Sequence, residues 1–383
     1  MTTDTDQPTA GQPTGAKRGA DALAMWGGEN TYATLTEIVE AARNELDPDV
    51  LDFLDGGAGD EVTLRRNAEA FARWAFRPRV MSGGPVPSTA TNFLGIPLSL
   101  PVLTAPFGGD RLFHPEGHVA VARANRAEGV ASIVPELGSF ALEELAAAAP
   151  AAARVAHLHP IGPSDNFAAM LARIERAGYE AVCVTVDAPT IGWRDRVLRR
   201  RYTPDLSVAM GNYPPDGDFT LQDVFGQFFT RDQPAWGWEQ LAELMAETTL
   251  PWIAKGILTG EDAEAAAAAG ASAVLVSNHG GRQLDGVPAA VEQLPEVADA
   301  VGGQLQIALD SGVRRGSEVV IAIALGADVV VLGRLAVYGL VAGGEQGVRR
   351  VLQLLREEIV TVLILLGRGG ISDLDRTALQ QGR

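Results

Sequence analysis

The chain of 383 residues holds a single cysteine, Cys183, which excludes an internal disulfide. Because Cys183 lies within the apolar run AVCVTV, we expect a small buried core residue rather than a nucleophile. Basic side chains are also scarce: 31 stand against 48 acidic ones, and the net charge of -17 disfavours nucleic acid and anionic membranes as partners. The apolar run at 359–367 falls far short of the roughly 18 residues that a membrane span needs. These scarcities favour a soluble protein of a reducing cytoplasm.

Histidines number only five, and none is spaced with acidic residues in a way that predicts a metal site. His114, in the sequence HPEG before a helix, and His118, on that helix, are expected to be structural. Residues 1–27 are rich in Thr, Pro, Gly, Gln and Asp and lack the apolar stretch of a secretion signal, so we expect a disordered tail. Residues 28–383 then form a single domain. The basic run RDRVLRRR at 194–201 is interpreted as a solvated loop or an oligomer contact.

From residue 102 onward, short apolar runs alternate with alanine-rich helical stretches, which indicates βα units and a parallel sheet. Eight such runs predict a (β/α)8 barrel over about residues 100–370, although periodicity alone also permits a doubly wound open sheet. Nearly every run ends in polar or glycine-rich residues, and a barrel would bring all of these ends to one site. The predicted strands are 102–107, 131–136, 154–159, 181–188, 251–257, 273–278, 305–310 and 328–333.

Two further segments flank or interrupt the predicted barrel. Residues 32–74 suggest a cap of two helices with a break at 55–59. Residues 199–238, after the fourth strand, contain four prolines and are long enough to form a lid. The aromatic residues of this insertion either cover the site or pack in the protein, and packing is the favoured role; they are Phe225, Phe228, Phe229, Trp236 and Trp238.

The loop SNHGGRQ, at 277–283, places an imidazole, His279, three positions before a guanidinium, Arg282. A base beside a carboxylate clamp suits the removal of a proton next to an acid group. The motifs DSGVRRG and LGR follow the seventh and eighth strands, where barrels commonly bind phosphate. Lys255, at the end of the fifth strand, would point into the same mouth and stabilise an anion. A phosphorylated cofactor is therefore implied.

Together these motifs resemble the FMN-dependent 2-hydroxy acid oxidases and dehydrogenases, a family that includes glycolate oxidase, lactate oxidase, lactate monooxygenase and mandelate oxidase. The resemblance covers roughly residues 32–375. Supporting matches are GAGDEVTLRRN, FRPR, HPEG, TVDAP and the Lys-Gly pair, and IGWR looks most like lactate monooxygenase. The resemblance implies bound FMN, oxidation of an L-2-hydroxy acid to a 2-oxo acid, and a homotetramer.

By this resemblance His279 removes the proton, Asp187 stabilises its imidazolium form, and Arg282 binds the substrate carboxylate together with Arg194. Lys255 would lie beside the flavin and stabilise the negative charge of the reduced ring. The physical requirements agree, since the oxidation needs a base, a carboxylate fork and an electron acceptor held against the alpha carbon. The residues that the resemblance assigns to the cofactor are Phe107, Gly108, Pro135, His157, Thr185, Lys255, Ser277, Asp310, Gly312, Arg314, Gly333 and Arg334.

Several positions that would face the substrate depart from the family pattern. Phe53 stands where a tyrosine is usual, and His157-Leu158-His159 replaces Gln-Leu-Tyr. The first two strands end in Phe107-Gly108-Gly109 and Pro135-Glu136-Leu137. Because buried sites discriminate strongly through such donors, we expect Phe53 and His159 to contact a non-standard or larger substrate. His159 is either a donor or acid–base group, or a tolerated rim histidine.

Two other functions stay open on the sequence alone. The altered strand ends would suit an FMN-dependent tailoring oxidase of an amino or peptide-like substrate in natural-product biosynthesis. A flavin-binding protein without turnover is a third reading, but retention of His279, Arg282, Asp187 and Arg194 opposes it. The electron acceptor, oxygen or a quinone or carrier, is not determined by these motifs.

Overall fold

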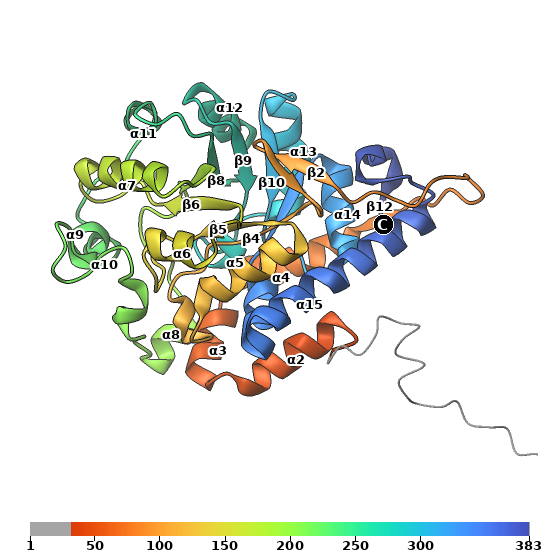
Figure 1. The fold of residues 1–383 in the computed structure, drawn as a ribbon. Coiled ribbons are helices and arrows are strands. Elements are labelled where there is room, and N and C mark those ends of the chain that lie inside the picture. Colours follow the sequence, from red (N-terminus) through yellow and green to blue (C-terminus); the bar gives the residue numbers. More distant parts are fainter. Residues whose placement is uncertain (1–31, 383) are drawn as a thin grey trace, which may run out of the picture.

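The computed structural model describes residues 32–382, so the tail expected at 1–27 lies outside the described residues. Eight parallel strands close into a barrel in the order β10-β11-β4-β5-β6-β7-β8-β9, which confirms the (β/α)8 prediction and rules out the open sheet (Figure 1). Each strand is shorter than the apolar run that predicted it. The strands are β4 (Val102–Thr104), β5 (Ala131–Val134), β6 (Arg154–Leu158), β7 (Ala181–Thr185), β8 (Trp252–Ile257), β9 (Ala273–Val276), β10 (Gln306–Leu309) and β11 (Val329–Leu332).

A principal helix follows each strand and packs outside the barrel. The last of these changes direction at Gly343 and Gly344, where Gly344 has a φ of 55°. The eight helices are α5 (Gly117–Glu128), α6 (Leu142–Ala148), α7 (Ser164–Arg176), α11 (Trp238–Met245), α12 (Gly260–Ala268), α13 (Ala290–Val301), α14 (Gly316–Leu325) and α15 (Arg334–Leu366).

Two layers of apolar side chains hold the barrel together. Alternate residues of each strand point inward, such as Leu103, Ile133 and Val155, and their neighbours pack against the outer helices. The hairpin of β2 (Thr91–Phe93) and β3 (Ile96–Leu98) contributes Phe93, Ile96 and Leu98 to the inner layer. Gln306, the first residue of β10, hydrogen-bonds this hairpin, which therefore covers the amino-terminal ends of the strands.

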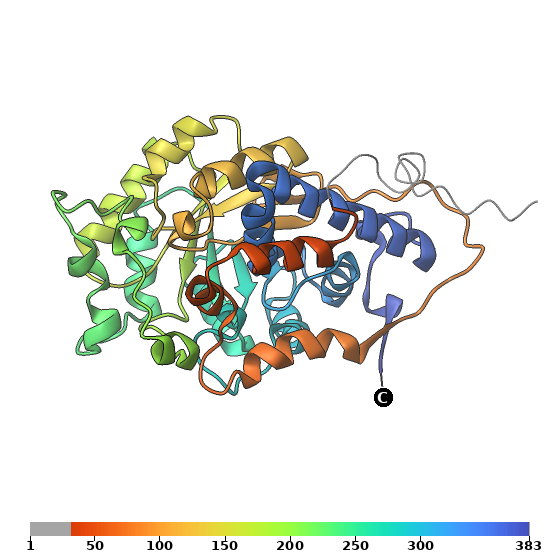
Figure 2. The same cartoon turned by 90° about the horizontal axis from the view of Figure 1, so that it is seen from below.

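The cap contains three α-helices where the sequence suggested two: α2 (Leu35–Glu45), α3 (Pro48–Asp55) and α4 (Val62–Glu69), with a 3-10 turn at Ala70–Arg73. The additional break arises because Pro48 cannot continue α2, and Asp47 caps a new helix by accepting from Asp49 N at 2.8 Å. The helices α2 and α3 lie below the barrel in Figure 1, and Figure 2 shows the cap from below.

The insertion at 199–238 forms short helical pieces rather than an irregular loop. They are the end of α8 (Asp195–Arg200), a 3-10 turn at Leu206–Ala209, α9 (Leu221–Phe225) and α10 (Gln227–Thr230). Its aromatic residues divide between two environments, since Phe225 is buried whereas Phe229 is 68% exposed. In the described part of the chain, no helix is long and apolar enough to cross a membrane.

Candidate active site

The inward-facing positions of the barrel strands continue directly into the residues expected at the site. Successive strand residues face opposite sides, so every second residue after Val155 on β6 points to the barrel axis. The same alternation holds on all eight strands and brings side chains from separate parts of the chain to one mouth. The positions reached in this way include Pro135, His157, His159, Thr185, Asp187, Lys255, Ser277, Asp310 and Gly333. The ring of Phe107, after the first strand, instead packs on Phe113 and on His118 of the outer helix α5.

His279, Asp187 and Lys255 meet at the ends of adjacent strands. The Nδ1 atom of His279 lies 3.2 Å from Asp187 Oδ1 and 3.2 Å from Lys255 Nζ. Lys255 Nζ is 3.9 Å from the same carboxylate oxygen. An Nδ1–H that donates to Asp187 leaves the Nε2 lone pair of His279 available, and no described residue occupies it. This is the arrangement of a base with its orienting carboxylate.

The charges of this cluster favour a neutral imidazole beside an ionised carboxylate. Burial, and then the neighbouring Lys255 cation, lowers the pKa of His279 to about 4, against the opposing effect of Asp187. Burial alone would raise the pKa of the Asp187 carboxyl, but Lys255 and His279 lower it to about 2. The imidazole can therefore accept a proton at neutral pH, and the carboxylate can stabilise the cation that results.

The two arginines expected to hold a carboxylate are both at this mouth. Arg282 donates through Nη1 to the carbonyls of Phe53, Leu54 and Gly56, at 2.8, 3.1 and 2.8 Å. Arg194 donates through Nε to the Arg282 carbonyl at 3.2 Å. Burial, followed by repulsion from Arg334, lowers the pKa of Arg194 to about 10, and burial also lowers the pKa of Arg282. Two cations held in partial burial form a site that a bound anion would stabilise.

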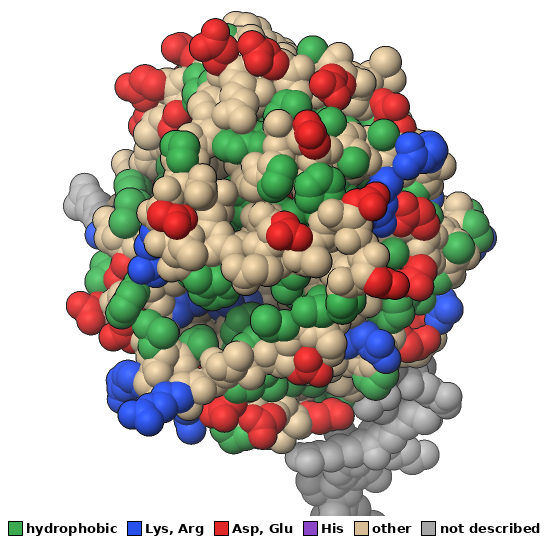
Figure 3. All heavy atoms as spheres, turned by 90° about the vertical axis from the view of Figure 1, so that its left-hand side faces the viewer, with side chains coloured by type: hydrophobic (Ala, Val, Ile, Leu, Met, Phe, Trp, Pro, Cys, Tyr) green, Lys and Arg blue, Asp and Glu red, His purple; other side chains and the backbone are tan. Residues whose placement is uncertain are grey.

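Phe53 lies under the Arg282 guanidinium, whose carbon is 5.4 Å from the ring centroid. A cation over an aromatic face is attractive, so the ring supports Arg282 even though it supplies no hydroxyl. Figure 3 shows a hollow in the face of the molecule formed by the insertion, with basic side chains in it and hydrophobic side chains around it.

Comparison with known proteins agrees with this geometry. Residues 42–381 match the FMN-dependent dehydrogenase family. The chain belongs to that family. It is 38% identical over 342 residues to the peroxisomal (S)-2-hydroxyacid oxidase of Arabidopsis thaliana, covering 89% of this chain and 94% of that protein. It is also 35% identical over 354 residues to the L-lactate oxidase of a Nostoc strain, covering 90% and 97%.

Comparison with solved structures agrees with the family assignment. The fold is similar to that of mandelate oxidase with (S)-2-phenylpropionate, with a TM-score of 0.83, 36% identity, and coverage of 92% of this chain and 99% of that one. The protein is thus an FMN-dependent oxidoreductase, as the motifs predicted, and FMN is its cofactor.

The residues at the mouth fit FMN. Nδ1 of His157 is buried and has no partner among the described residues, while Nε2 of the same ring lies 2.6 Å from Thr185 Oγ1. Lys255 is buried, with its amino group among the inward-facing residues. A Cβ placed on Gly333 would meet no atom within 4 Å, so the end of β11 borders open space. A free polar atom, a cation and an open glycine edge suit the ring edge and phosphate of this cofactor.

The remaining residues assigned to the cofactor are placed less uniformly. Arg314 lies toward solvent and pairs with Glu318 at 2.6 Å, and Arg334 donates to cap carbonyls, including that of Leu54 at 2.9 Å. Gly312, with a φ of 107°, packs against the backbone of Asn67 in the cap. Gly108 packs against Leu137 in the next strand-end loop. The assignment of these four residues to FMN is our proposal.

Three residues that support His159 were missed by sequence reasoning: Glu136, Tyr213 and Asn212. The Glu136 carboxylate accepts from His159 Nδ1 at 2.8 Å and from His159 N at 2.7 Å, and it also accepts from the Tyr213 hydroxyl. Asn212 donates to the Glu136 carbonyl at 2.8 Å. An acidic residue two positions after the apolar strand β5 was the only sequence signal, because nothing marked Tyr213 within the insertion.

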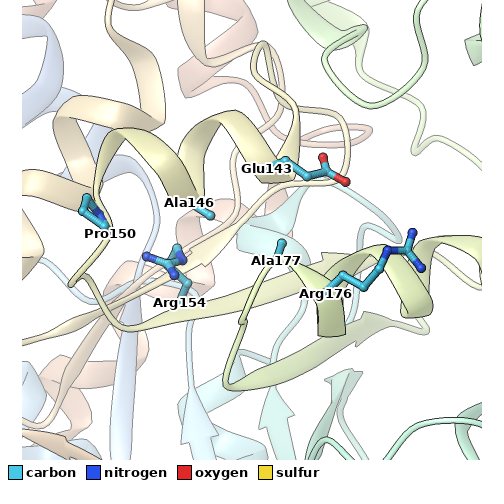
Figure 4. A pocket seen from close by; sticks show the side chains of 6 residues that line it. All are labelled: Glu143, Ala146, Pro150, Arg154, Arg176 and Ala177. Carbon is cyan, nitrogen blue, oxygen red and sulfur yellow. The ribbon is translucent and has the colours of Figure 1, made fainter.

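A second hollow lies on the outer surface between α6 and α7, away from this mouth. Figure 4 shows that Glu143, Arg154 and Arg176 border it. Arg154 is the first residue of β6, at the opposite end of that strand from the inward-facing His157. This outer hollow is therefore separate from the candidate active site.

Proposed function

We propose that this protein oxidises an L-2-hydroxy acid to the corresponding 2-oxo acid. The observation that carries the proposal is the contact of His279 with Asp187 and Lys255, at 3.2 Å each, in a mouth that also holds Arg194 and Arg282. A flavin-binding protein without turnover would have no use for an oriented base beside two arginines. This geometry supports catalysis over that alternative.

Each side chain of the site has its own role in such an oxidation. The free nitrogens of Arg194 and Arg282 hold the substrate carboxylate, which turns the 2-hydroxyl toward Nε2 of His279. His279 takes the hydroxyl proton, and Asp187 stabilises the resulting imidazolium. Lys255 supplies positive charge beside the cofactor position. Bound FMN supplies the two-electron acceptor for the hydrogen of the alpha carbon.

We infer further that oxygen is the final electron acceptor, because the relatives reported above are named oxidases. The substrate is larger than, or different from, glycolate and lactate, since Phe53 supplies no hydroxyl and His159 stands where the family has a phenol. A location in the cytoplasm and a homotetramer also stay proposals. Val80, Met81, Val86, Ile364 and Leu365 support the oligomer because they are large apolar side chains exposed at 58% or more.

The test is anaerobic mixing of the purified yellow protein with a panel of L-2-hydroxy acids, from glycolate to aryl-lactates, while flavin absorbance is followed. We expect at least one acid to bleach the flavin, and His279→Ala to slow bleaching by about a thousandfold or more while FMN stays bound, because the base is lost. His114→Gln is the matched control, since this ring accepts from Glu116 N at 3.2 Å outside the mouth. Bleaching that persists in His279→Ala would contradict the assigned base.

A further inference from the structure

His159 is held as firmly as the base itself, but by a different carboxylate. Both its backbone N–H and its ring Nδ1 donate to the same oxygen of Glu136, at 2.7 and 2.8 Å. Glu136 is 1% exposed, and its other oxygen accepts from the Tyr213 hydroxyl. Donors thus surround a buried carboxylate that has no contact with solvent, so its position is tightly determined.

Three aromatic neighbours fix the plane of the His159 ring. Phe225 and Phe228, from the insertion, approach it at 5.3 and 5.8 Å with interplanar angles of 87° and 83°. His157 approaches at 4.6 Å and 79°. These are edge-to-face arrangements, which are favourable for aromatic rings. Rotation of the imidazole would lose both the Glu136 bond and this packing.

The other ring nitrogen of His159 is the polar atom left free. Nδ1 is committed to Glu136, and Nε2 has no partner among the residues that the structure describes. Among the described residues, the ring nitrogens that are sealed from solvent and also lack a partner are both nitrogens of His118 and Nδ1 of His157, so the unpartnered Nε2 of His159 is not sealed. Because the His159 side chain follows the inward-facing positions of β6, this free atom belongs to the mouth that contains His279.

A histidine held in this way offers the substrate a different group from a phenol. A phenol donates its hydrogen, whereas an imidazole whose Nδ1 proton points at a carboxylate offers the lone pair of Nε2 when the ring is neutral. Resting on the proposed function, we propose that Glu136 is a positioning residue that makes His159 Nε2 an acceptor. This acceptor selects 2-hydroxy acids that carry a second O–H or N–H donor beyond the 2-hydroxyl group.

The charged groups around His159 are compatible with Nε2 acting as a hydrogen-bond acceptor. Asp187 follows the neighbouring strand β7, Lys255 lies on β8 beyond it, and both contact His279. Arg173 donates to Asn212 at the far side of Glu136. His157 has its pKa lowered well below the ordinary value by burial first and His159 second, so it adds no cation beside the acceptor. No described residue donates to Nε2, so a donor on a substrate bound in the mouth can reach this atom.

The experiment compares matched substrates in the FMN-loaded protein. The pairs are L-glycerate with L-lactate and L-4-hydroxyphenyllactate with L-phenyllactate, and kcat/KM is measured for each acid. We expect the acid with the additional hydroxyl to be preferred in at least one pair by about tenfold to a hundredfold, because a buried partner left unpaired is costly. His159→Phe, which keeps an aromatic ring but removes Nε2, should abolish the preference.

Variants of Glu136 distinguish the loss of His159 positioning from general damage to the fold. Glu136→Ala should remove most of the preference, and Glu136→Gln should keep it, because the Gln oxygen still accepts from Nδ1. Damage to the fold would lower kcat/KM for both members of a pair and leave their ratio unchanged. Glu143→Gln, a surface change on α6, is the control and should leave the ratio at the wild-type value.

Failure of this inference and failure of the proposed function would give different results. Equal kcat/KM within both pairs in the wild-type protein, or a preference that survives both His159→Phe and Glu136→Ala, would overturn this inference and leave the proposed function intact. A flavin that none of the four acids, nor any acid of the wider panel, reduces would instead overturn the proposed function, and this inference with it. If the His159→Phe variant does not fold, the comparison of Glu136→Ala with Glu136→Gln tests the inference.

Discussion

His279 adopts a backbone conformation that side chains rarely take up. Its φ is 59°, and Ser311, in the loop after the next strand, has a φ of 72°. Left-handed conformations cost a residue with a side chain roughly 1–2 kcal/mol, and they persist where surrounding bonds determine them. Here Ser277 Oγ accepts from His279 N at 3.0 Å, and Ser311 Oγ accepts from Gly280 N at 3.0 Å. The strained turn aims the imidazole at Asp187.

Ser311 offers a test of this strain. Ser311→Ala keeps the left-handed backbone but removes a hydroxyl that accepts from Asn278 N and Gly280 N, so we expect the free energy of unfolding to fall by about 1–3 kcal/mol. Ser311→Gly loses the same bonds but relieves the strain, so its loss should be smaller by about 1 kcal/mol. Urea denaturation measures both, and equal losses would contradict the strain argument.

The acid limb of activity depends on His279, since only the neutral ring accepts a proton. With its pKa at about 4, activity should be lost as the pH falls through about 4. Lys255 is the charged neighbour that lowers this pKa, so Lys255→Met should move the limb to higher pH, toward the ordinary value of 6.5. Flavin reduction rates from pH 3.5 to 8, with FMN in excess, measure the shift. A limb that stays in place or moves down would contradict this electrostatic account.

At the scale of elements, the cap helix α4 supports the loop that carries the base. Asn67, on α4, and Asn278, beside His279, exchange amide hydrogen bonds of 2.8 and 2.7 Å. Asp285, beyond the loop, accepts from Thr63 N at 2.8 Å at the start of α4. Gly281 packs so closely on Leu64 that an added Cβ would lie 2.7 Å from its backbone nitrogen. Cap and catalytic loop therefore form one unit.

Asn67→Ala should weaken this unit. The buried Asn278 amide loses two hydrogen bonds, so we expect the free energy of unfolding to fall by about 1–3 kcal/mol and kcat to fall severalfold as the loop loosens. Thermal denaturation and flavin reduction measure the two effects. Arg65→Ala, on the exposed side of the same helix, is the control and should change neither. A normal kcat in Asn67→Ala would show that the loop holds its shape without the cap.

At the scale of the whole molecule, one group of exposed apolar side chains lies at the end of α15 and on the segment beside it. Arg79 N donates to Leu366 O at 3.2 Å, which joins the projecting segment that holds Val80 and Met81 to the helix end with Ile364 and Leu365. Figures 1 and 2 both show this segment on the side opposite the insertion. Most of α15 faces inward, so only its last turn remains for an interface.

We expect Met81→Glu with Leu365→Glu to reduce the oligomer to smaller species, because two carboxylates would be desolvated in each contact. Light scattering after gel filtration measures the mass. Leu206→Glu, at an apolar site in the insertion that is 49% exposed, should leave it unchanged. A wild-type protein that elutes as a single chain would contradict the proposed homotetramer.

Much of this architecture follows from local patterns. The eight apolar runs predicted the strands because a buried parallel strand needs continuous apolar residues, and the loop SNHGGRQ marked His279 and Arg282 by residue type and spacing. The inward direction of Thr185, Lys255 and Asp310 follows from the two-residue period once the barrel is assumed. The break between α2 and α3 was missed, although Asp47 and Pro48 signal it, because the glycine-rich stretch after it is the stronger cue.

The sequence by itself determined the eight βα units and the cofactor family and marked His279 as the candidate base, since each depends on periodicity or on a motif within a few residues. Only the tertiary structure decided what surrounds His159. Glu136 is 23 positions away and Tyr213 is 77 positions from Glu136, on separate loops. No local pattern records such a contact, because it exists only when barrel closure sets β5 beside β6 and the insertion folds over both.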